Sequence, residues 1–195
     1  MLAILTYHLS TVLLLLIVSA AAVTDLRRHR IPNLLSLGGA GLGLALQTWT
    51  LGLNGLFDAL GGLCVGLGLL LPFYIGRGMG AGDVKLMAAA GAFFGWPDAL
   101  LATGMSLGAG TVIGGGILVV RGGLGLMLSR YYSSLRCLLS TGQLVYIPAS
   151  ATEPARTRFP YAIAIAAGTT AALWWRDELN YHEFHNGILA LFGAA

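Results

Sequence analysis

The chain has 195 residues, of which 56% are hydrophobic and only 10% are charged. Soluble domains carry about 25% charged residues, so this composition excludes an ordinary soluble domain and indicates an all-α, polytopic membrane protein. The net charge of +3 comes without a long Lys/Arg run, so no nucleic-acid partner is expected. The length suits a single membrane-embedded domain over residues 1–195, with the lipid bilayer as its surroundings.

Hydrophobic segments predict six membrane spans when their lengths as helices are compared with the thickness of a bilayer core, about 30 Å. The predicted spans cover residues 2–23, 34–53, 56–75, 84–96, 99–120 and 160–175, and residues 96–98 (WPD), with Pro97 at their centre, are expected to break the helix between the fourth and the fifth. The fourth rises only about 20 Å as a helix, so the bend before it is expected to lie partly below the lipid surface. Residues 124–139 place apolar side chains at helical spacing with arginines among them, which predicts an amphipathic helix on the membrane surface. A loop is predicted over residues 141–158.

The basic residues orient these spans. If the loop after the first span is cytoplasmic, nearly every Lys and Arg lies at the inner side, as the positive-inside rule requires. The inner residues are Arg27, Arg28, Arg30, Arg77, Lys85, Arg121, Arg130, Arg136, Arg156 and Arg158, and the outer one is Arg176. Both termini are therefore predicted to lie outside.

Two aspartates end up on the same side of the predicted membrane. Asp25 ends the first span going in, and Asp83 closes the glycine-rich bend over residues 78–83 and begins the fourth span. An ionisable group at the edge of a hydrophobic span is costly, so each is a functional-site hypothesis. Two adjacent carboxylates tend to share a proton, so one can take a proton from water while the other polarises a carbonyl. This pairing predicts peptide hydrolysis by water, with no metal and no cofactor.

The same residues carry a resemblance to a known family. Residues 80–83 (GAGD) and their continuation VKL resemble the GxGD motif of the type IV prepilin peptidases, which are membrane aspartyl proteases. Asp25 with residues 31–33 (IPN) resembles the first aspartate segment of the family, and residues 160–162 (PYA) are similar to a third, weaker signature. The resemblance implies a GxGD-protease-like fold in the bacterial inner membrane. It also implies a prepilin substrate, with a basic leader before a hydrophobic helix, and catalysis by Asp25 and Asp83.

Several neighbouring residues are expected to support this chemistry. Gly80 and Gly82 would let a substrate strand approach the carboxylates, although they also suit a simple turn between helices. Lys85 either anchors the bend to anionic lipid headgroups or acts through its charge on the nearby pair of aspartates. Pro160 and Tyr161 are most simply a helix start and its interface aromatic, and they are candidate supporting residues.

The sequence also departs from the larger members of the family that it resembles. Those members carry a cysteine tetrad near the N-terminus and methylate the new pilin terminus. The two cysteines here, Cys64 and Cys137, form no such tetrad, so methyltransferase activity is not expected. The chain more closely resembles the short, peptidase-only members of Tad/Cpa secretion systems, which process Flp-type pilins.

Other classes of function stay open at this stage. Asp25 alone could be an interfacial carboxylate paired with Arg27 or Arg28. A small proton- or cation-coupled transporter subunit could use two inner-face carboxylates, although carriers more often place them near the midplane. A non-enzymatic pilus-assembly scaffold is a further alternative. Faces of small residues permit a homo-oligomer without requiring one.

Overall fold

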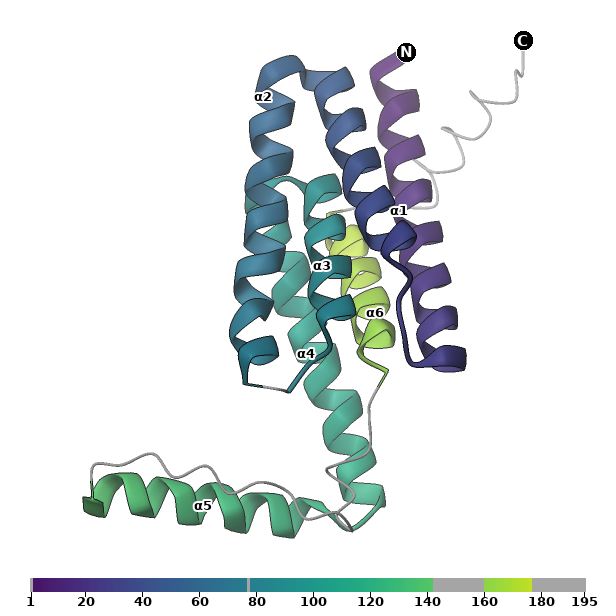
Figure 1. Ribbon diagram of the computed structural model, residues 1–195. Coiled ribbons are helices and arrows are strands. Elements are labelled where there is room, and N and C mark those ends of the chain that lie inside the picture. The colour runs from purple at the N-terminus through teal and green to yellow at the C-terminus, as the bar shows by residue number, and fades with distance from the viewer. Residues whose placement is uncertain (1, 77, 142–159, 177–195) are drawn as a thin grey trace. The chain divides into compact units, whose positions relative to one another are not determined.

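The computed structural model describes residues 2–76, 78–141 and 160–176, and within them every regular element is a helix (Figure 1). The prediction of an all-α protein is therefore confirmed. The predicted loop over 141–158 lies almost wholly outside the described residues, as do Arg77 and the tail from 177. The helices are α1 (Leu2–Arg28), α2 (Asn33–Ile75), α3 (Ala81–Phe94), α4 (Trp96–Val120), α5 (Leu124–Thr141) and α6 (Tyr161–Trp175).

The chain divides into two compact units. One comprises residues 1–110 with 160–195, and the other comprises residues 111–159. The second unit contains α5, so the helix predicted over 124–139 is confirmed, while its position on a membrane surface stays a prediction. The proposal of one domain over the whole chain also stays a prediction. All candidate site residues belong to the first unit, which contains α1, α2, α3, α6 and the beginning of α4.

Helix α2 consists of two limbs, which correspond to the predicted second and third spans. The limbs meet at Gly52, whose φ of 63° and ψ of −142° are open to glycine but rarely to other residues. Gly55 then lies against the carbonyl oxygen of Gln47, where a Cβ would collide with the backbone. These two glycines reverse the chain, and each limb has about 20 residues, the length that a bilayer requires.

Helix α3 lies at the centre of the first unit. Every residue from Leu86 to Phe94 is buried, on all faces of the helix. Its packing depends on glycine contacts with α2: Gly91 lies against the carbonyl group of Gly62, and Gly66 lies against that of Met87. Helices α1 and α6 also pack on α3. The burial of all its faces, and not its apolar composition alone, identifies α3 as an enclosed helix, because a lipid-facing span can be apolar on every face as well.

The boundary between α3 and α4 differs from the predicted one. The predicted fourth span ends at 96 and the fifth begins at 99, with Pro97 as the expected helix break between them. Instead α3 ends at Phe94, and Gly95 (φ 79°) makes the turn. Trp96 begins α4, and its N–H donates to Asp58 Oδ1 at 3.2 Å. Pro97 fits in the first turn of α4 because no intrahelical partner exists there for the missing N–H.

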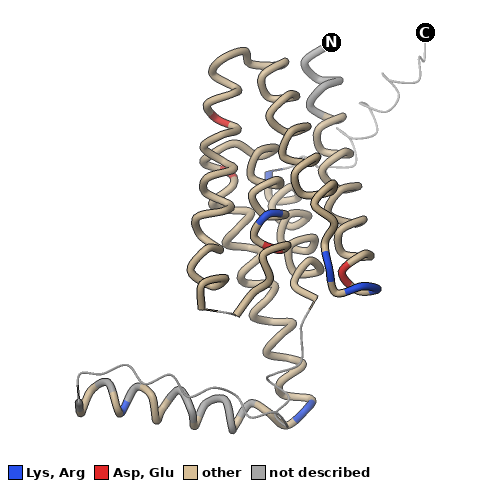
Figure 2. The backbone as a smooth tube through the Cα atoms, in the orientation of Figure 1, with Lys and Arg blue, Asp and Glu red and all other residues tan. Residues whose placement is uncertain are grey.

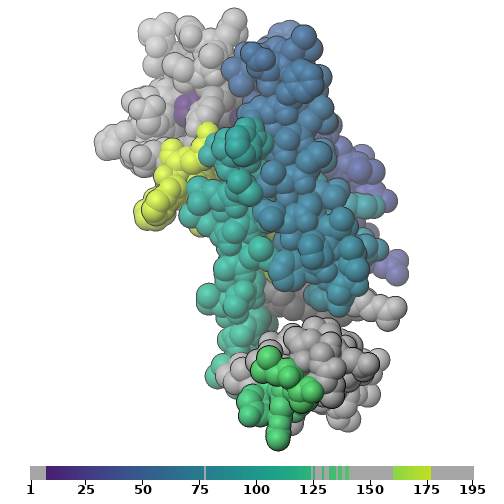
Figure 3. Space-filling model, turned by 90° about the vertical axis from the view of Figure 1, so that its left-hand side faces the viewer, coloured from purple at the N-terminus to yellow at the C-terminus, as the bar shows by residue number. Residues whose placement is uncertain are grey.

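Three helices of the described chain are long and apolar enough to cross a membrane: α1 from His8, α2 and α4. Helix α6 is apolar but shorter. Charged residues are few along the helices of the first unit (Figure 2). Large side chains of α2 are exposed, including Leu34, Trp49 and Phe57, and α2 covers much of the surface in Figure 3. An exposed apolar surface of this extent suits contact with lipid.

Candidate active site

The structure brings the two predicted aspartates together. Asp25 lies near the C-terminal end of α1, and Asp83 lies in the first turn of α3, which packs against α1. Each is only 8% exposed. They are close enough for the charge of Asp25 to act on the Asp83 carboxyl. Burial of two interacting carboxylates is unfavourable when both are ionised, which makes the two aspartates candidates for an acid–base pair.

The Asp83 side chain folds back over the start of its own helix. Its Oδ2 accepts the N–H of Gly80 at 3.2 Å, and the N–H of Asp83 in turn donates to the Gly80 carbonyl at the same distance. Such a contact satisfies one of the orphan donors at a helix start. A Cβ on Gly80 would lie 3.1 Å from Oδ2. Glycine at position 80 therefore leaves this carboxylate room to adopt its conformation.

The surroundings of Asp83 include the connection between α1 and α2. A Cβ on Gly82 would lie 3.2 Å from Ile31 Cβ, so the open side of Gly82 is occupied by Ile31 of the same chain. Lys85 Nζ donates to Asn33 Oδ1 at 3.3 Å. The sequence predicts a role for Gly82 in substrate approach, and for Lys85 a role in lipid binding or in supporting the aspartate pair. In the structure both residues contact residues 31–33: Gly82 lies against Ile31, and Lys85 donates to Asn33. No sequence pattern predicted these two contacts.

Exposed arginines follow Asp25 in the sequence, but in the described part of the chain none of them forms an ion pair with Asp25. Arg27, Arg28 and Arg30 are exposed, and the ion pair of the described residues joins Arg176 to Asp98. The carbonyl of Asp25 accepts the N–H of His29 at 2.8 Å as α1 ends. No contact in the described residues therefore supports the alternative in which Asp25 pairs with an adjacent arginine.

Tyr161 approaches the same end of the bundle from α6. Pro160 caps this helix, and the Tyr161 hydroxyl donates to the Ser106 carbonyl of α4 at 3.2 Å. The ring lies against Gly110, where a side chain would collide with it. Tyr161 and Asp83 interact electrostatically, so the third sequence signature lies near the pair. Ser106 and Gly110 were not among the residues predicted from the sequence. Their spacing of four places two small residues on one face of α4, and this pattern was the available sign that another helix packs closely there.

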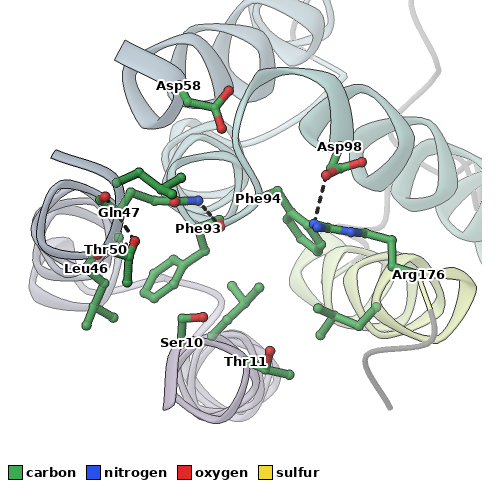
Figure 4. Close-up of a pocket in the computed structure, with 14 residues that line it drawn as sticks. Ser10, Thr11, Leu46, Gln47, Thr50, Asp58, Phe93, Phe94, Asp98 and Arg176 are labelled. Atoms are coloured by element: carbon green, nitrogen blue, oxygen red, sulfur yellow. Dashed lines mark hydrogen bonds and ion pairs between the residues drawn. The ribbon is translucent and has the colours of Figure 1, made fainter. Parts of the chain in front are cut away.

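A separate cavity lies toward the other end of the first unit (Figure 4). Its volume is about 320 Å³, and it does not include either aspartate of the pair. Across it Arg176 Nη1 contacts Asp98 Oδ2 at 2.9 Å, and Gln47 Nε2 donates to the Phe93 carbonyl at 2.9 Å. Among the described residues no group of three His, Cys, Asp or Glu side chains could hold a metal ion.

Taken together, the helices and the buried carboxylates define a helical membrane protein with a candidate acid–base pair. The family model described as the type IV leader peptidase family matches residues 12–115, more than half of the chain. The chain therefore belongs to the type IV leader peptidase family, and the resemblance noted from the sequence is confirmed. The match includes both aspartates but not Pro160 or Tyr161.

One curated relative adds detail. The chain is 40% identical over 82 residues to the prepilin leader peptidase/N-methyltransferase of Escherichia coli (strain K12). The alignment covers 38% of this chain and 36% of the relative, so the chain spans little more than a third of that protein. No solved structure matches the chain.

Proposed function

We propose that this protein is a membrane aspartyl endopeptidase that cleaves the leader peptide of Flp-type prepilins at the cytoplasmic face of the bacterial inner membrane. The observation that carries the proposal is the burial of Asp25 and Asp83 at the ends of two packed helices, each within reach of the other's charge, from positions 58 residues apart in the sequence, in a member of this family. A chance pair of buried, interacting carboxylates would be costly to keep.

The pair suggests a mechanism with water as the nucleophile. One carboxylate is ionised and accepts a proton from a water molecule as its oxygen attacks the carbonyl carbon of the scissile bond. The other is protonated and donates to the carbonyl oxygen. Collapse of the tetrahedral intermediate breaks the C–N bond, and a proton passes to the leaving amine. The pair thus cycles one proton, and no covalent intermediate or metal takes part.

Six membrane crossings are compatible with the helices: α1, the two limbs of α2, α3, α4 and α6. Helix α3 would cross enclosed by α1, α2 and α6, which pack on it, so it needs no full-length lipid-facing surface. All four tryptophans lie near the helix ends remote from Asp25 and Asp83, at 49, 96, 174 and 175, and all are exposed. Tryptophans are enriched at both membrane interfaces, so this end would lie at an interface. The side would be set by the exposed Arg27, Arg28 and Arg30 at the opposite end, which the positive-inside rule orients inward. The aspartate end would then face the cytoplasm.

Hydrolysis in H₂¹⁸O tests the proposed reaction directly. The purified chain, reconstituted in bilayers, should cleave a peptide containing a basic leader and the first hydrophobic helix of a prepilin. One ¹⁸O atom should appear in the new carboxylate of the leader after a single turnover, by mass spectrometry, and excess EDTA should leave the rate unchanged. A peptide with its basic leader removed is the matched control. Loss of activity with EDTA, restored by metal, would contradict the two-aspartate mechanism.

Tyr161 is proposed to support the pair from α6. Tyr161→Phe removes the hydroxyl that donates to the Ser106 carbonyl, so the ring should hold its place less firmly. One neutral hydrogen bond is worth about 0.5–1.5 kcal/mol, so the cleavage rate should fall about 2- to 12-fold. Gly108→Ala, at an open position of the neighbouring α4, should leave the rate unchanged. A Tyr161→Phe variant with the full rate would restrict this residue to packing.

A further inference from the structure

Two residues that flank Asp83 in the sequence contact the chain between α1 and the start of α2: Gly82 lies against Ile31, and Lys85 donates to Asn33. We propose that residues Ile31 and Asn33 form a positioning segment that holds the first turn of α3 so that Asp83 faces Asp25. This inference rests on the proposed function for its consequence in catalysis, but the placement itself can be tested without any substrate. Neither residue needs to touch the reacting atoms.

The first contact is steric. The backbone of Gly82 lies directly on Ile31: a Cβ at position 82 would be 3.2 Å from Ile31 Cβ and 3.5 Å from its Cγ1 and Cδ1. Ile31 is itself partly buried and packs against the hydrophobic core. Packed interiors deform little, so Ile31 fixes how closely the start of α3 approaches the end of α1. Gly82 immediately precedes Asp83, so this distance is set one residue from the carboxylate.

The second contact is polar and lies on the other flank. Lys85 Nζ donates to Asn33 Oδ1 at 3.3 Å, two residues after Asp83. Asn33 is the first residue of α2, and its neighbour Pro32 offers its carbonyl to the N–H of Leu35. The side chain of Asn33 therefore projects from the firm start of a helix. The Ile31 contact restrains the position of the first turn of α3, and the exposed Lys85–Asn33 hydrogen bond adds a weaker polar link on its other side.

The segment is also joined to Asp25 through a short, turned piece of chain. The Asp25 carbonyl accepts the N–H of His29, and His29 adopts a φ of 48°, which is uncommon for a residue with a side chain. Only a few residues then lead to Ile31. The positioning segment is thus tied covalently to one aspartate and by packing to the other. Displacing the segment should change the separation of the two carboxylates.

The chemical consequence follows from the need for both carboxylates at one water molecule. A misplacement of about 1 Å at a catalytic group can cost about 10²-fold in rate. Loss of the positioning segment should therefore lower kcat while KM stays near its original value, because the surface that receives the substrate is unchanged. A purely structural role would instead reduce the amount of folded protein and leave kcat per folded molecule intact.

Cross-linking measures the placement directly and needs no cleavage. In a Cys64→Ser, Cys137→Ser background, Asp25→Cys and Asp83→Cys should join rapidly on mild oxidation. Adding Ile31→Ala and Asn33→Ala should slow this cross-link about 10-fold or more, as expected for a lost alignment. Asn54→Ala, a matched change at an exposed position of α2, should have no effect. An unchanged cross-linking rate without the positioning segment would overturn the inference.

A rescue experiment addresses the catalytic consequence. Gly82→Ala should lower kcat about 10- to 100-fold with KM unchanged, because the new methyl group presses on Ile31 and shifts Asp83. Adding Ile31→Ala removes the Cγ1 and Cδ1 contacts and should restore part of kcat. Gly104→Ala, at an open glycine of α4, is the control. A folded Gly82→Ala protein that Ile31→Ala fails to rescue would contradict the positioning role. If the Asp25→Cys, Asp83→Cys variant cross-links and responds to the positioning segment as expected, but the wild-type chain cleaves no prepilin, the proposed function alone is refuted.

Discussion

Asp25→Asn and Asp83→Asn should each abolish leader cleavage while the protein still inserts and folds. Asparagine keeps the size and most hydrogen bonds of aspartate, but it neither accepts a proton from water nor delivers one to a carbonyl oxygen. General acid–base groups typically contribute about 10²–10⁴-fold. Because the two carboxylates act on one water molecule as a unit, either substitution should remove nearly the whole effect. The double variant should be no slower than either single variant.

The measurement is the initial cleavage rate of a reconstituted prepilin peptide, normalised to folded protein from circular dichroism. Asp58→Asn is the matched control, because Asp58 lies near the remote end of the bundle and accepts the N–H of Trp96 there. This control should keep its rate within about twofold, because asparagine retains the side-chain oxygen that accepts the Trp96 N–H and position 58 lies away from the pair. If either Asp25→Asn or Asp83→Asn cleaved near the wild-type rate, that aspartate would be structural. The transport and scaffold alternatives would then gain weight.

Gly91→Ala should destabilise the protein more strongly than its small added volume suggests. Gly91 and Gly62 contact one another backbone to backbone, and a Cβ on either would collide with the carbonyl group of the other. No flexible side chain can move aside, so α3 and α2 would have to separate. Overpacking a core costs about 1–3 kcal/mol and occasionally more, and a backbone collision belongs at the upper end. Because α3 carries Asp83, cleavage should be lost together with stability.

The matched control for this effect is Gly68→Ala, on the same limb of α2 as Gly62 but with nothing within 4 Å of the added methyl group. Alanine favours a helix over glycine by up to about 1 kcal/mol, so this variant should be as stable as wild type or slightly more stable. Unfolding in mixed detergent micelles, followed by circular dichroism, gives both values. Equal stability of Gly91→Ala and wild type would mean that the two backbones do not touch at this point.

Hydrophobic pattern was sufficient to predict the helices and most of their bounds. The reversal between the limbs of α2, predicted between 53 and 56, occurs at Gly52 nearby. The error at the start of α4 has a local cause. Pro97 was read as a helix breaker, whereas a proline in the first turn is tolerated and the left-handed Gly95 makes the turn. Periodicity also does not distinguish a lipid-facing span from the enclosed α3, because both are apolar on every face.

The sequence by itself determined the membrane class, the family, and the pair of aspartates that its topology brings to one side. Composition, charge bias and the GxGD pattern are local properties, so they can be read along the chain. Only the tertiary structure decided which residues surround the pair. Gly82 packs on Ile31, Lys85 donates to Asn33, and Tyr161 donates to the Ser106 carbonyl. These partners are about 50 residues apart in sequence, and their meeting depends on how closely glycines let the helices approach, which no local pattern records.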